Sequence, residues 1–260
     1  MTIVGARPQF VKLKPLSDQI KNHFTEIIVH TGQHYDEQMS EIFFSELNIP
    51  TPDYNLNVRS GSPGYQLAEM LKGIETVIIK ESPDLIIVFG DTNSTLAGGI
   101  CAVQNHIPFA HIEAGPRNKY IDVPEMLNRL IVDNISPLLF CATKKNYNTL
   151  VSEGLKENAY FVGDLMYDIF LQNLEKINNQ KHILNHIGVS KNNYHVATCH
   201  RAENTDSKKR LETIIKGLIE SNETIVFSIH PRTKKMIEKY NLMKLIDHCD
   251  NLIKIDPVVE

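Results

Sequence analysis

The 260-residue sequence lacks an apolar run of the roughly 18 residues that a membrane-spanning helix requires, and its longest run, Asp84–Phe89, has the length of a strand. The N-terminus, Met1–Gly5, has no basic region, no long apolar region and no small-residue cleavage site, which argues against a signal peptide. Charge of one sign is not in excess either, because 27 Lys and Arg against 31 Asp and Glu give a formal net charge of −4. We therefore expect neither nucleic acid nor an anionic membrane surface as a partner.

Cysteine is scarce, and its placement suits neither a disulfide framework nor a metal site. Cys101, Cys141, Cys199 and Cys249 are widely spaced without a CxxC pair, and three of them lie in or beside apolar runs. We expect buried free thiols in the reducing cytoplasm. An HExxH motif is also missing, so the sequence does not favour a metal centre. Without GxGxxG, Walker or GxSxG motifs, it indicates neither a nicotinamide enzyme nor a serine hydrolase.

Short apolar runs alternate with helical-period segments along the whole chain. Strands are expected at 2–4, 26–30, 84–89, 108–112, 138–142, 160–162, 195–199, 224–228 and 252–255. Helices are expected at 13–22, 37–47, 65–80, 94–104 and 145–153, with a further helix beginning at Glu125. This repetition predicts parallel, doubly wound α/β sheets. The pattern loosens after residue 163, so we expect two domains, 1–163 and 164–260. The second has only three strands and is expected to be incomplete.

Ligands of open α/β sheets bind beyond the carboxyl ends of the strands, and several of these ends carry ionisable side chains. Arg7 and Lys12 follow the first strand at a helix N-terminus, where positive charge is unfavourable unless an anion such as phosphate is bound. Solvated side chains and a loop ion pair are the alternative for these two residues. Gln33 and His34 follow the second strand and could hydrogen-bond a ligand.

Three carboxylates are expected at one rim of the first sheet. Asp91 and Glu113 each follow a predicted strand, and Glu125 begins the next helix. As alternatives, Asp91 could serve as a turn acceptor, and Glu125 could be a first-turn acid paired with Arg129 four residues later. Converging carboxylates are typical of general acid–base sites, which favours a catalytic role for the three.

The second part of the chain carries basic groups after two of its predicted strands. His200 and Arg201 follow the strand at 195–199, and His230 follows the strand at 224–228. If the two domains form a cleft, a histidine and an arginine aimed into it would suit the diphosphate of a nucleotide.

Five motif regions, in order along the chain, carry a family resemblance. They are GARPQFVK, HTGQHYDEQMSEIFF, GDTNSTLAG, HIEAGPR with PEMLNR, and CHRAEN. As a set they resemble the non-hydrolysing UDP-N-acetylglucosamine 2-epimerases and their relatives that act on diacetamido uronic acid sugar nucleotides. The resemblance covers essentially the whole chain and implies two Rossmann-like domains of GT-B type. Residues 1–163 would then form a catalytic domain, and 164–260 a partial UDP-binding domain.

The activity that this resemblance implies is epimerisation at C2, which converts UDP-N-acetylglucosamine to UDP-N-acetylmannosamine. UDP leaves by anti elimination to give a 2-acetamidoglucal and then adds again. The C2 proton is not alpha to a carbonyl, so departure of the leaving group must help to make it removable. Such a reaction needs carboxylates near C2 and cations on the diphosphate, but no metal or nicotinamide, because no net redox change occurs. A homodimer is also implied.

Carried over by position, the resemblance implies four catalytic residues: Asp91, Glu113, Glu125 and, near the leaving diphosphate, His200. The residues expected to bind substrate are Arg7, Lys12, Gln33, His34, Arg117, Arg201 and His230. Of these, Gln33, His34 and His230 match positions that form a second, regulatory UDP-sugar site in some bacterial members.

Three departures from the family pattern bear on activity. Pro116 replaces the usual leucine of EAGLR, and Met126 replaces the second acid of PEE. The chain also ends at Glu260 without the DSGG-type loop and the later glutamate that hold UDP in the family. We therefore expect weak or absent activity. The alternatives are a non-catalytic nucleotide-sugar-binding fragment, an epimerase of a UDP-diacetamido uronic acid, and a GT-B glycosyltransferase.

Overall fold

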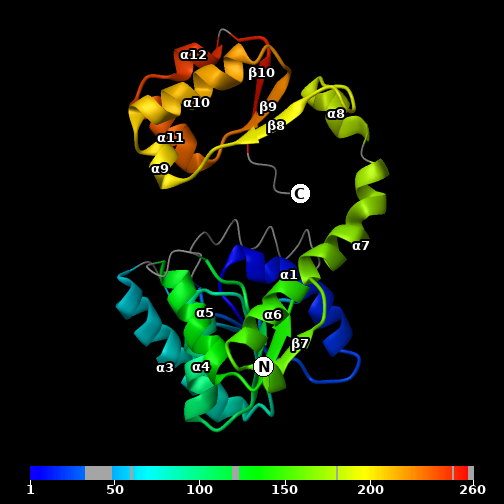
Figure 1. Ribbon diagram of the computed structural model, residues 1–260, viewed down its shortest axis with the longest axis vertical. Coiled ribbons are helices and arrows are strands. Elements are labelled where there is room, and N and C mark those ends of the chain that lie inside the picture. Colours follow the sequence, from blue (N-terminus) through cyan, green and yellow to red (C-terminus); the bar gives the residue numbers. More distant parts are fainter. Residues whose placement is uncertain (33–48, 59–60, 119–122, 180, 248, 257–260) are drawn as a thin grey trace. The chain divides into compact units, whose positions relative to one another are not determined.

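The computed structural model describes most of the chain as two compact units, Met1–Asn173 and Leu174–Glu260 (Figure 1). The described residues are 1–32, 49–58, 61–118, 123–179, 181–247 and 249–256. The helix expected at 37–47 lies outside them. The division between the two units falls within helix α7 (Leu165–Asn179), and the boundary predicted from the sequence lies between residues 163 and 164.

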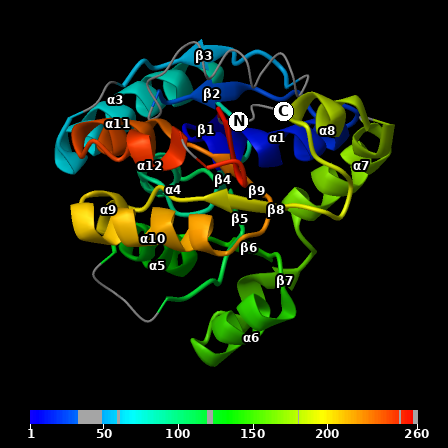
Figure 2. The same cartoon turned by 90° about the horizontal axis from the view of Figure 1, so that it is seen from above.

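The first unit is built on a parallel sheet of seven strands in the order β3-β2-β1-β4-β5-β6-β7 (Figure 2). The strands are β1 (Thr2–Val4), β2 (Ile28–His30), β3 (Tyr54–Asn55), β4 (Ile86–Phe89), β5 (Phe109–Ile112), β6 (Leu138–Cys141) and β7 (Ala159–Phe161). Strands β4 and β5 pair from Ile86↔Phe109 to Phe89↔Ile112, so the segments that follow Phe89 and Ile112 leave the sheet side by side. The six strands expected in this region are confirmed, and the two-residue β3 was not predicted.

Helices cover both faces of this sheet. They are α1 (Arg7–Ile20), α3 (Pro63–Glu81), α4 (Asn93–Gln104), α5 (Pro124–Ile135) and α6 (Lys144–Ser152), with the 3-10 helix η1 (Lys156–Asn158) and the start of α7. Helix α1 begins earlier than expected, because the Gln9 side chain accepts hydrogen bonds from the backbone N–H groups of Gly5 (2.7 Å) and Ala6 (3.0 Å). These hydrogen bonds satisfy donors at the helix start, where the N-cap residue Ala6 has no polar side chain.

The hydrophobic core has two layers, because successive residues of a strand point to opposite faces of the sheet. On one face, Ile3 and Val88 pack with the buried stripes of α3 and α4. Helices α3, α4 and α5 lie side by side on this face (Figure 1). On the other face, Val4 and Phe89 pack against Phe10 of α1. The period of the apolar residues thus fixes which side of each helix faces the sheet.

The second unit contains a parallel sheet of three strands in the order β10-β9-β8. Its elements are α8 (Lys181–Ile187), β8 (His195–Thr198), α9 (Ala202–Thr205), α10 (Lys208–Glu220), β9 (Ile225–Ser228), α11 (Pro231–Lys239), α12 (Met243–Asp247) and β10 (Leu252–Ile255). The three expected strands are confirmed. Buried residues such as Leu211, Phe227 and Ile237 give this unit a core of its own.

All four cysteines are free, and Cys101, Cys141 and Cys199 are buried, as the sequence predicts. None of the described helices combines the length and the apolarity needed to cross a lipid bilayer.

Candidate functional site

The end of strand β4 is held in place by a buried glutamine of α1. Gln9 Nε2 donates to the carbonyl oxygen of Phe89 (2.8 Å) and to the hydroxyls of Thr92 (3.0 Å) and Thr95 (3.1 Å). Gly90 follows with φ of +66°, a conformation that favours glycine. The turn that carries Asp91 is therefore fixed by side-chain contacts, and Gln9 is a supporting residue that the sequence motifs did not single out.

Glu113 lies directly after strand β5 in a left-handed backbone conformation, with φ of +68°. A non-glycine residue in this region costs about 1–3 kcal/mol, and such strain is often part of a functional site. The Glu113 carboxylate forms an ion pair with Lys12 Nζ, and Lys12 is largely buried. Lys12 thus brings positive charge from α1 to a carboxylate that ends a neighbouring strand.

Helix α5 contributes the group that joins the two acids. Arg129 is buried, and its Nη2 lies 2.7 Å from Asp91 Oδ2 and 4.0 Å from Glu113 Oε1, while its Nη1 donates to the Glu113 carbonyl oxygen. Asn128 donates to the Asp91 carbonyl oxygen at 3.0 Å. The alternative that Arg129 pairs with Glu125 is therefore wrong, because the guanidinium turns toward Asp91 and Glu113.

Glu125 occupies the first turn of α5 and is exposed. It shares a helix face with Asn128 and Arg129, three and four residues later. Within the described part of the chain, its carboxylate makes no hydrogen bond or ion pair. The site thus contains two carboxylates matched by two cations, and a third carboxylate without a partner among the described residues.

A pocket of about 260 Å³ opens beside the ion pair of Lys12 and Glu113. Its polar lining is completed by Asp164 and Asp168, and its apolar lining comes from α1, the ends of β5 and β6, the segment after β7 and the start of α7. Asp164 Oδ1 accepts a hydrogen bond from the backbone N–H of Met166 (2.8 Å), which caps the start of α7. This pocket is therefore lined by charged side chains, among them Lys12 and Glu113, and by an apolar wall.

Arg117 has two carboxylate partners within the protein. Its Nη1 lies 2.7 Å from Asp133, and its Nε and Nη2 bind Glu153 at 2.9 and 2.6 Å. Burial alone would raise the pKa of Asp133, but hydrogen bonds and charge from His111 and Arg117 outweigh it and leave this pKa below its usual value. Arg117 thus holds the segment after Glu113 in place. The contact of Arg117 with substrate that the sequence suggests stays a prediction.

The second unit brings its two predicted histidines together. His200 and His230 follow neighbouring strands, and their ring centroids are 5.3 Å apart. His230 Nδ1 accepts the backbone N–H of Arg232 (3.2 Å) and so caps α11. Arg201 is well exposed, 3.9 Å from Glu203.

Three further residues were predicted to bind substrate. Arg7 is the exposed first residue of α1, in the first unit. Gln33 and His34 lie outside the described residues. Among the described residues, no group of three or more His, Cys, Asp or Glu side chains is arranged to hold a metal ion.

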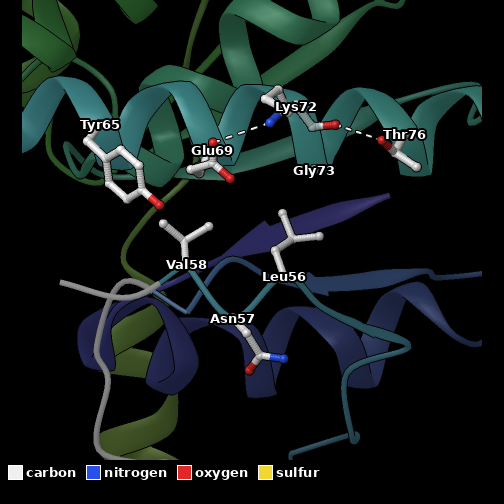
Figure 3. Close-up of a pocket in the computed structure, with 8 residues that line it drawn as sticks. All are labelled: Leu56, Asn57, Val58, Tyr65, Glu69, Lys72, Gly73 and Thr76. Atoms are coloured by element: carbon white, nitrogen blue, oxygen red, sulfur yellow. Dashed lines mark hydrogen bonds and ion pairs between the residues drawn. The ribbon is translucent and has the colours of Figure 1, made fainter. Parts of the chain in front are cut away.

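A second pocket, of about 390 Å³, lies between α3 and the segment after β3 (Figure 3). Tyr65, Glu69 and Lys72 of α3 line one side, and Glu69 and Lys72 form an ion pair at 3.4 Å. Leu56 and Val58 line the other side. None of the predicted site residues that the structure describes lines this pocket.

Comparison with known proteins places this geometry in a family. A protein-family model described as UDP-N-acetylglucosamine 2-epimerase matches residues 18–259. A "UDP-N-acetylglucosamine 2-epimerase homolog" from Methanococcus maripaludis is 52% identical over 259 residues, which cover 99% of this chain and 72% of that relative. The chain belongs to the UDP-N-acetylglucosamine 2-epimerase family.

Two further comparisons concern a relative with a different named substrate and a solved structure. A UDP-2,3-diacetamido-2,3-dideoxy-D-glucuronate 2-epimerase of Pseudomonas aeruginosa is 44% identical over 251 residues, covering 93% of this chain and 69% of the relative. The crystal structure of Methanocaldococcus jannaschii UDP-GlcNAc 2-epimerase in complex with UDP-GlcNAc and UDP superposes with a TM-score of 0.85 at 41% identity. That match covers 99% of this chain and 73% of the other.

Membership of the UDP-N-acetylglucosamine 2-epimerase family confirms the resemblance carried by the motifs. It also confirms the fold class expected from the sequence, namely an α/β protein with two Rossmann-like units of GT-B type. The epimerase motifs GDTNSTLAG, HIEAGPR and PEMLNR are the segments that carry Asp91, Glu113 and Arg129. The three motifs thus meet around one guanidinium group.

Proposed function

We propose that this chain is a UDP-sugar 2-epimerase that interconverts UDP-N-acetylglucosamine and UDP-N-acetylmannosamine by elimination and re-addition of UDP. The observation that carries the proposal is the arrangement of Asp91 and Glu113 around Arg129 at the carboxyl edge of the first sheet, with Lys12 against Glu113. A related enzyme of the same family has been crystallised with UDP-GlcNAc and UDP, which supports a UDP-sugar as the ligand.

In the proposed reaction, a carboxylate takes the C2 proton while the bond from C1 to the diphosphate oxygen breaks and UDP leaves with the bonding electron pair. UDP adds again to the 2-acetamidoglucal, and C2 receives a proton on the opposite face, so atoms and charge balance. We assign Asp91, Glu113 and Glu125 to proton transfer and to stabilisation of the oxocarbenium-like transition state. The fixed backbone at Glu113 supports this assignment, because a positioned acid or base loses activity when it moves.

The leaving diphosphate needs positive charge, and we assign His200 to stabilise it as it departs. Arg7 and Lys12 in the first unit and Arg201 in the second are proposed to bind substrate, with Arg117 behind Glu113. Gln33, His34 and His230 are proposed for the second, regulatory UDP-sugar site. The reaction needs no metal or nicotinamide, because it involves no net redox change.

The sugar itself has two candidates. The relative from Pseudomonas aeruginosa, 44% identical, carries the name of a diacetamido-glucuronate epimerase, so a UDP-diacetamido uronic acid is the second candidate substrate. The test is to incubate the full chain with each UDP-sugar and to follow the anomeric proton signals by NMR. We expect the signals of the C2 epimer to grow slowly from one of the two substrates, in keeping with the weak activity expected from the sequence.

A binding-only role makes a different prediction. If calorimetry shows that UDP binds while neither sugar nucleotide is epimerised, the chain is a non-catalytic nucleotide-sugar-binding protein and the proposed function is wrong. A glycosyltransferase would instead transfer the sugar to an acceptor and would not require the acids that face C2.

We further propose that the chain forms a homodimer in a reducing cytoplasm. Four unpaired thiols support a reducing compartment.

Self-association is supported by an exposed apolar stripe at α5, formed by Val123, Leu127, Ile131 and Ile135 at four-residue spacing. Sedimentation equilibrium should give twice the chain mass of 29.6 kDa, and Leu127→Asp should shift it toward the monomer. A monomeric wild type at micromolar concentration would contradict the proposal.

A further inference from the structure

A fully buried histidine lies behind the acids of the site. His111, on strand β5, has no solvent exposure, and its two ring nitrogens meet different elements of the fold. Nδ1 lies 2.7 Å from Asp133 Oδ1 on α5, and Nε2 lies 2.6 Å from the Gly90 carbonyl oxygen at the end of β4. Both distances are those of well-formed hydrogen bonds.

The two partners of His111 determine how many protons its ring carries. A carbonyl oxygen only accepts hydrogen bonds, so Nε2 must be an N–H group. Asp133 also accepts from the backbone N–H of Gly115 (3.2 Å) and from Arg117 (2.7 Å). Asp133 Oδ2 takes both of these donors, and a carboxylate paired with a guanidinium in this way accepts hydrogen bonds and does not donate one to Nδ1. Each ring nitrogen of His111 thus faces an acceptor, which is the arrangement of an imidazolium.

The surrounding charges balance such a cation. Asp133 has no solvent exposure and lies between His111 and Arg117, and Arg117 is in turn paired with Glu153. These four groups alternate in sign from the protein interior to the surface. From strand β6, Cys141 adds no charge, because burial raises the pKa of its thiol to about 11. A buried cation with an ion-paired carboxylate and satisfied hydrogen bonds avoids the large cost of an isolated charge.

The position of this network links every segment that carries a proposed acid. Gly90, which His111 holds, directly precedes Asp91. Asp133 binds Gly115, two residues after Glu113, and it lies one helical turn beyond Arg129 on α5. We infer that His111 is a positioning residue for the proposed 2-epimerase reaction, held as an imidazolium whose two N–H groups fasten the Asp91 and Glu113 segments to helix α5. The inference rests on the proposed function.

The protonation state can be measured without any activity assay. In the full chain labelled with ¹⁵N-histidine, NMR at pH 7.5 should show one histidine with both ring nitrogens protonated and protected from solvent exchange. This signal should disappear in His111→Gln. A His111 ring with one unprotonated nitrogen would overturn the inference, and this measurement on the wild type does not depend on the folding of any variant.

Two substitutions separate the two hydrogen bonds of the His111 ring. Asn places a donor near the position of Nδ1 and keeps the contact with Asp133, whereas Gln places one near Nε2 and keeps the contact with Gly90. We expect His111→Asn and His111→Gln each to lower the rate of hydrogen exchange at C2 of the UDP-sugar about 10- to 100-fold, as is common for outer-shell partners. The dissociation constant for UDP should change less than about twofold, because neither bond reaches the diphosphate.

His195→Gln, at an exposed histidine of β8, is the matched control and should leave both quantities unchanged. Wild-type exchange rates in both His111 variants, or a parallel loss of UDP binding, would overturn the positioning role. Absence of exchange in the wild type would contradict the proposed function and the positioning role together. An unprotonated nitrogen in the NMR experiment would instead overturn this inference alone, so the two failures are distinguishable.

Discussion

Arg129 shows how strongly the site depends on one side chain. Its guanidinium binds Asp91, 38 residues away in sequence, and the Glu113 carbonyl oxygen, 16 residues away. The sequence spacing alone suggests a local ion pair with Glu125, four residues before it. Only the fold reveals the more distant acceptors, because the ends of β4 and β5 lie side by side opposite this face of α5. The positions of the acids could thus be predicted from strand ends, but their partners could not.

Replacing Glu113 by Gln preserves its size and removes the charge that faces Lys12 and Arg129. We expect Glu113→Gln to lower the epimerisation rate about 100- to 10,000-fold, the usual range for a general acid or base, while UDP binding is retained. The rate is measured by NMR and the binding by calorimetry. Glu212→Gln, on α10, serves as the control. A Glu113→Gln variant with more than about a tenth of the wild-type rate would contradict the assigned role.

The reactivity of the four cysteines tests the burial of individual side chains. Burial raises the pKa of the Cys101 thiol to about 12 and that of Cys141 to about 11, and Cys199 is buried as well. Since the thiolate is the reactive form, these three should react slowly with an aromatic disulfide reagent at pH 8. We expect Cys249, which is partly exposed, to react first, and all four to react in guanidinium. Rapid modification of two or more thiols in the native protein would contradict the buried positions.

At the scale of elements, helix α5 organises the site. Glu125, Arg129 and Asp133 follow one another at four-residue spacing on one face, so a single helix presents an acid, a bridging cation and a buried carboxylate. Arg129 and Asp133 bind the segments after β4 and β5. Displacement of this helix would therefore move Asp91 and Glu113 together.

Asp133→Asn should be strongly destabilising, because it leaves His111 and Arg117 without their buried anion. We expect the free energy of unfolding to fall by about 3–5 kcal/mol at pH 7. The pKa of Asp133 is lower in the folded protein than its ordinary 3.8, so its contribution is complete above that value and is lost as the pH falls through the folded-state value. Urea unfolding at pH 7 and at lower pH should show the difference from wild type shrinking on acidification.

Asp250→Asn is the control for that series, since Asp250 is exposed. It should change the free energy of unfolding by less than about 0.5 kcal/mol at any pH. A difference between wild type and Asp133→Asn that stays constant with pH would contradict the account of the buried pair.

The strands other than β3, and the helices α1, α3, α4, α5 and α6, could be predicted from apolar periodicity, whereas the helices α7 to α12 were not predicted. Strand β3 has only two residues, which is too short for an alternating pattern. Helices α7 and α8 extend into a polar segment that weakens the periodic signal. The early start of α1 depends on the Gln9 side chain, which no periodicity reports. The left-handed conformation of Glu113 is likewise set by its surroundings and not by residue type.

At the scale of the whole molecule, the two units have separate hydrophobic cores. The first is centred on both faces of the seven-stranded sheet, and the second on the three-stranded sheet with α10 and α11. Units with independent cores can fold independently. Catalysis by the first unit and UDP binding by the second stay predictions. They can be tested on the separate units, because each unit has a core of its own.

We expect the fragment Met1–Asn173 to fold on its own. It should show a cooperative urea transition and a near-UV circular dichroism signal, because it retains its core and the network around His111. Its affinity for UDP should be lower than that of the full chain, since His200 and Arg201 are missing. A fragment without cooperative unfolding, or one that binds UDP as tightly as the full chain, would contradict this division of labour.

The central claim is that acids at the carboxyl edge of the first sheet exchange the C2 proton of a UDP-sugar. The most direct measurement is deuterium incorporation at C2 in D₂O, followed over hours by NMR, for wild type and Glu125→Gln. Glu125 has no partner for its carboxylate among the described residues, so its loss should change reactivity more than structure. The account predicts deuterium at C2 of both epimers with the wild type and incorporation at least about 100-fold slower with Glu125→Gln. Equal rates in the two proteins, or no incorporation by the wild type, would contradict it.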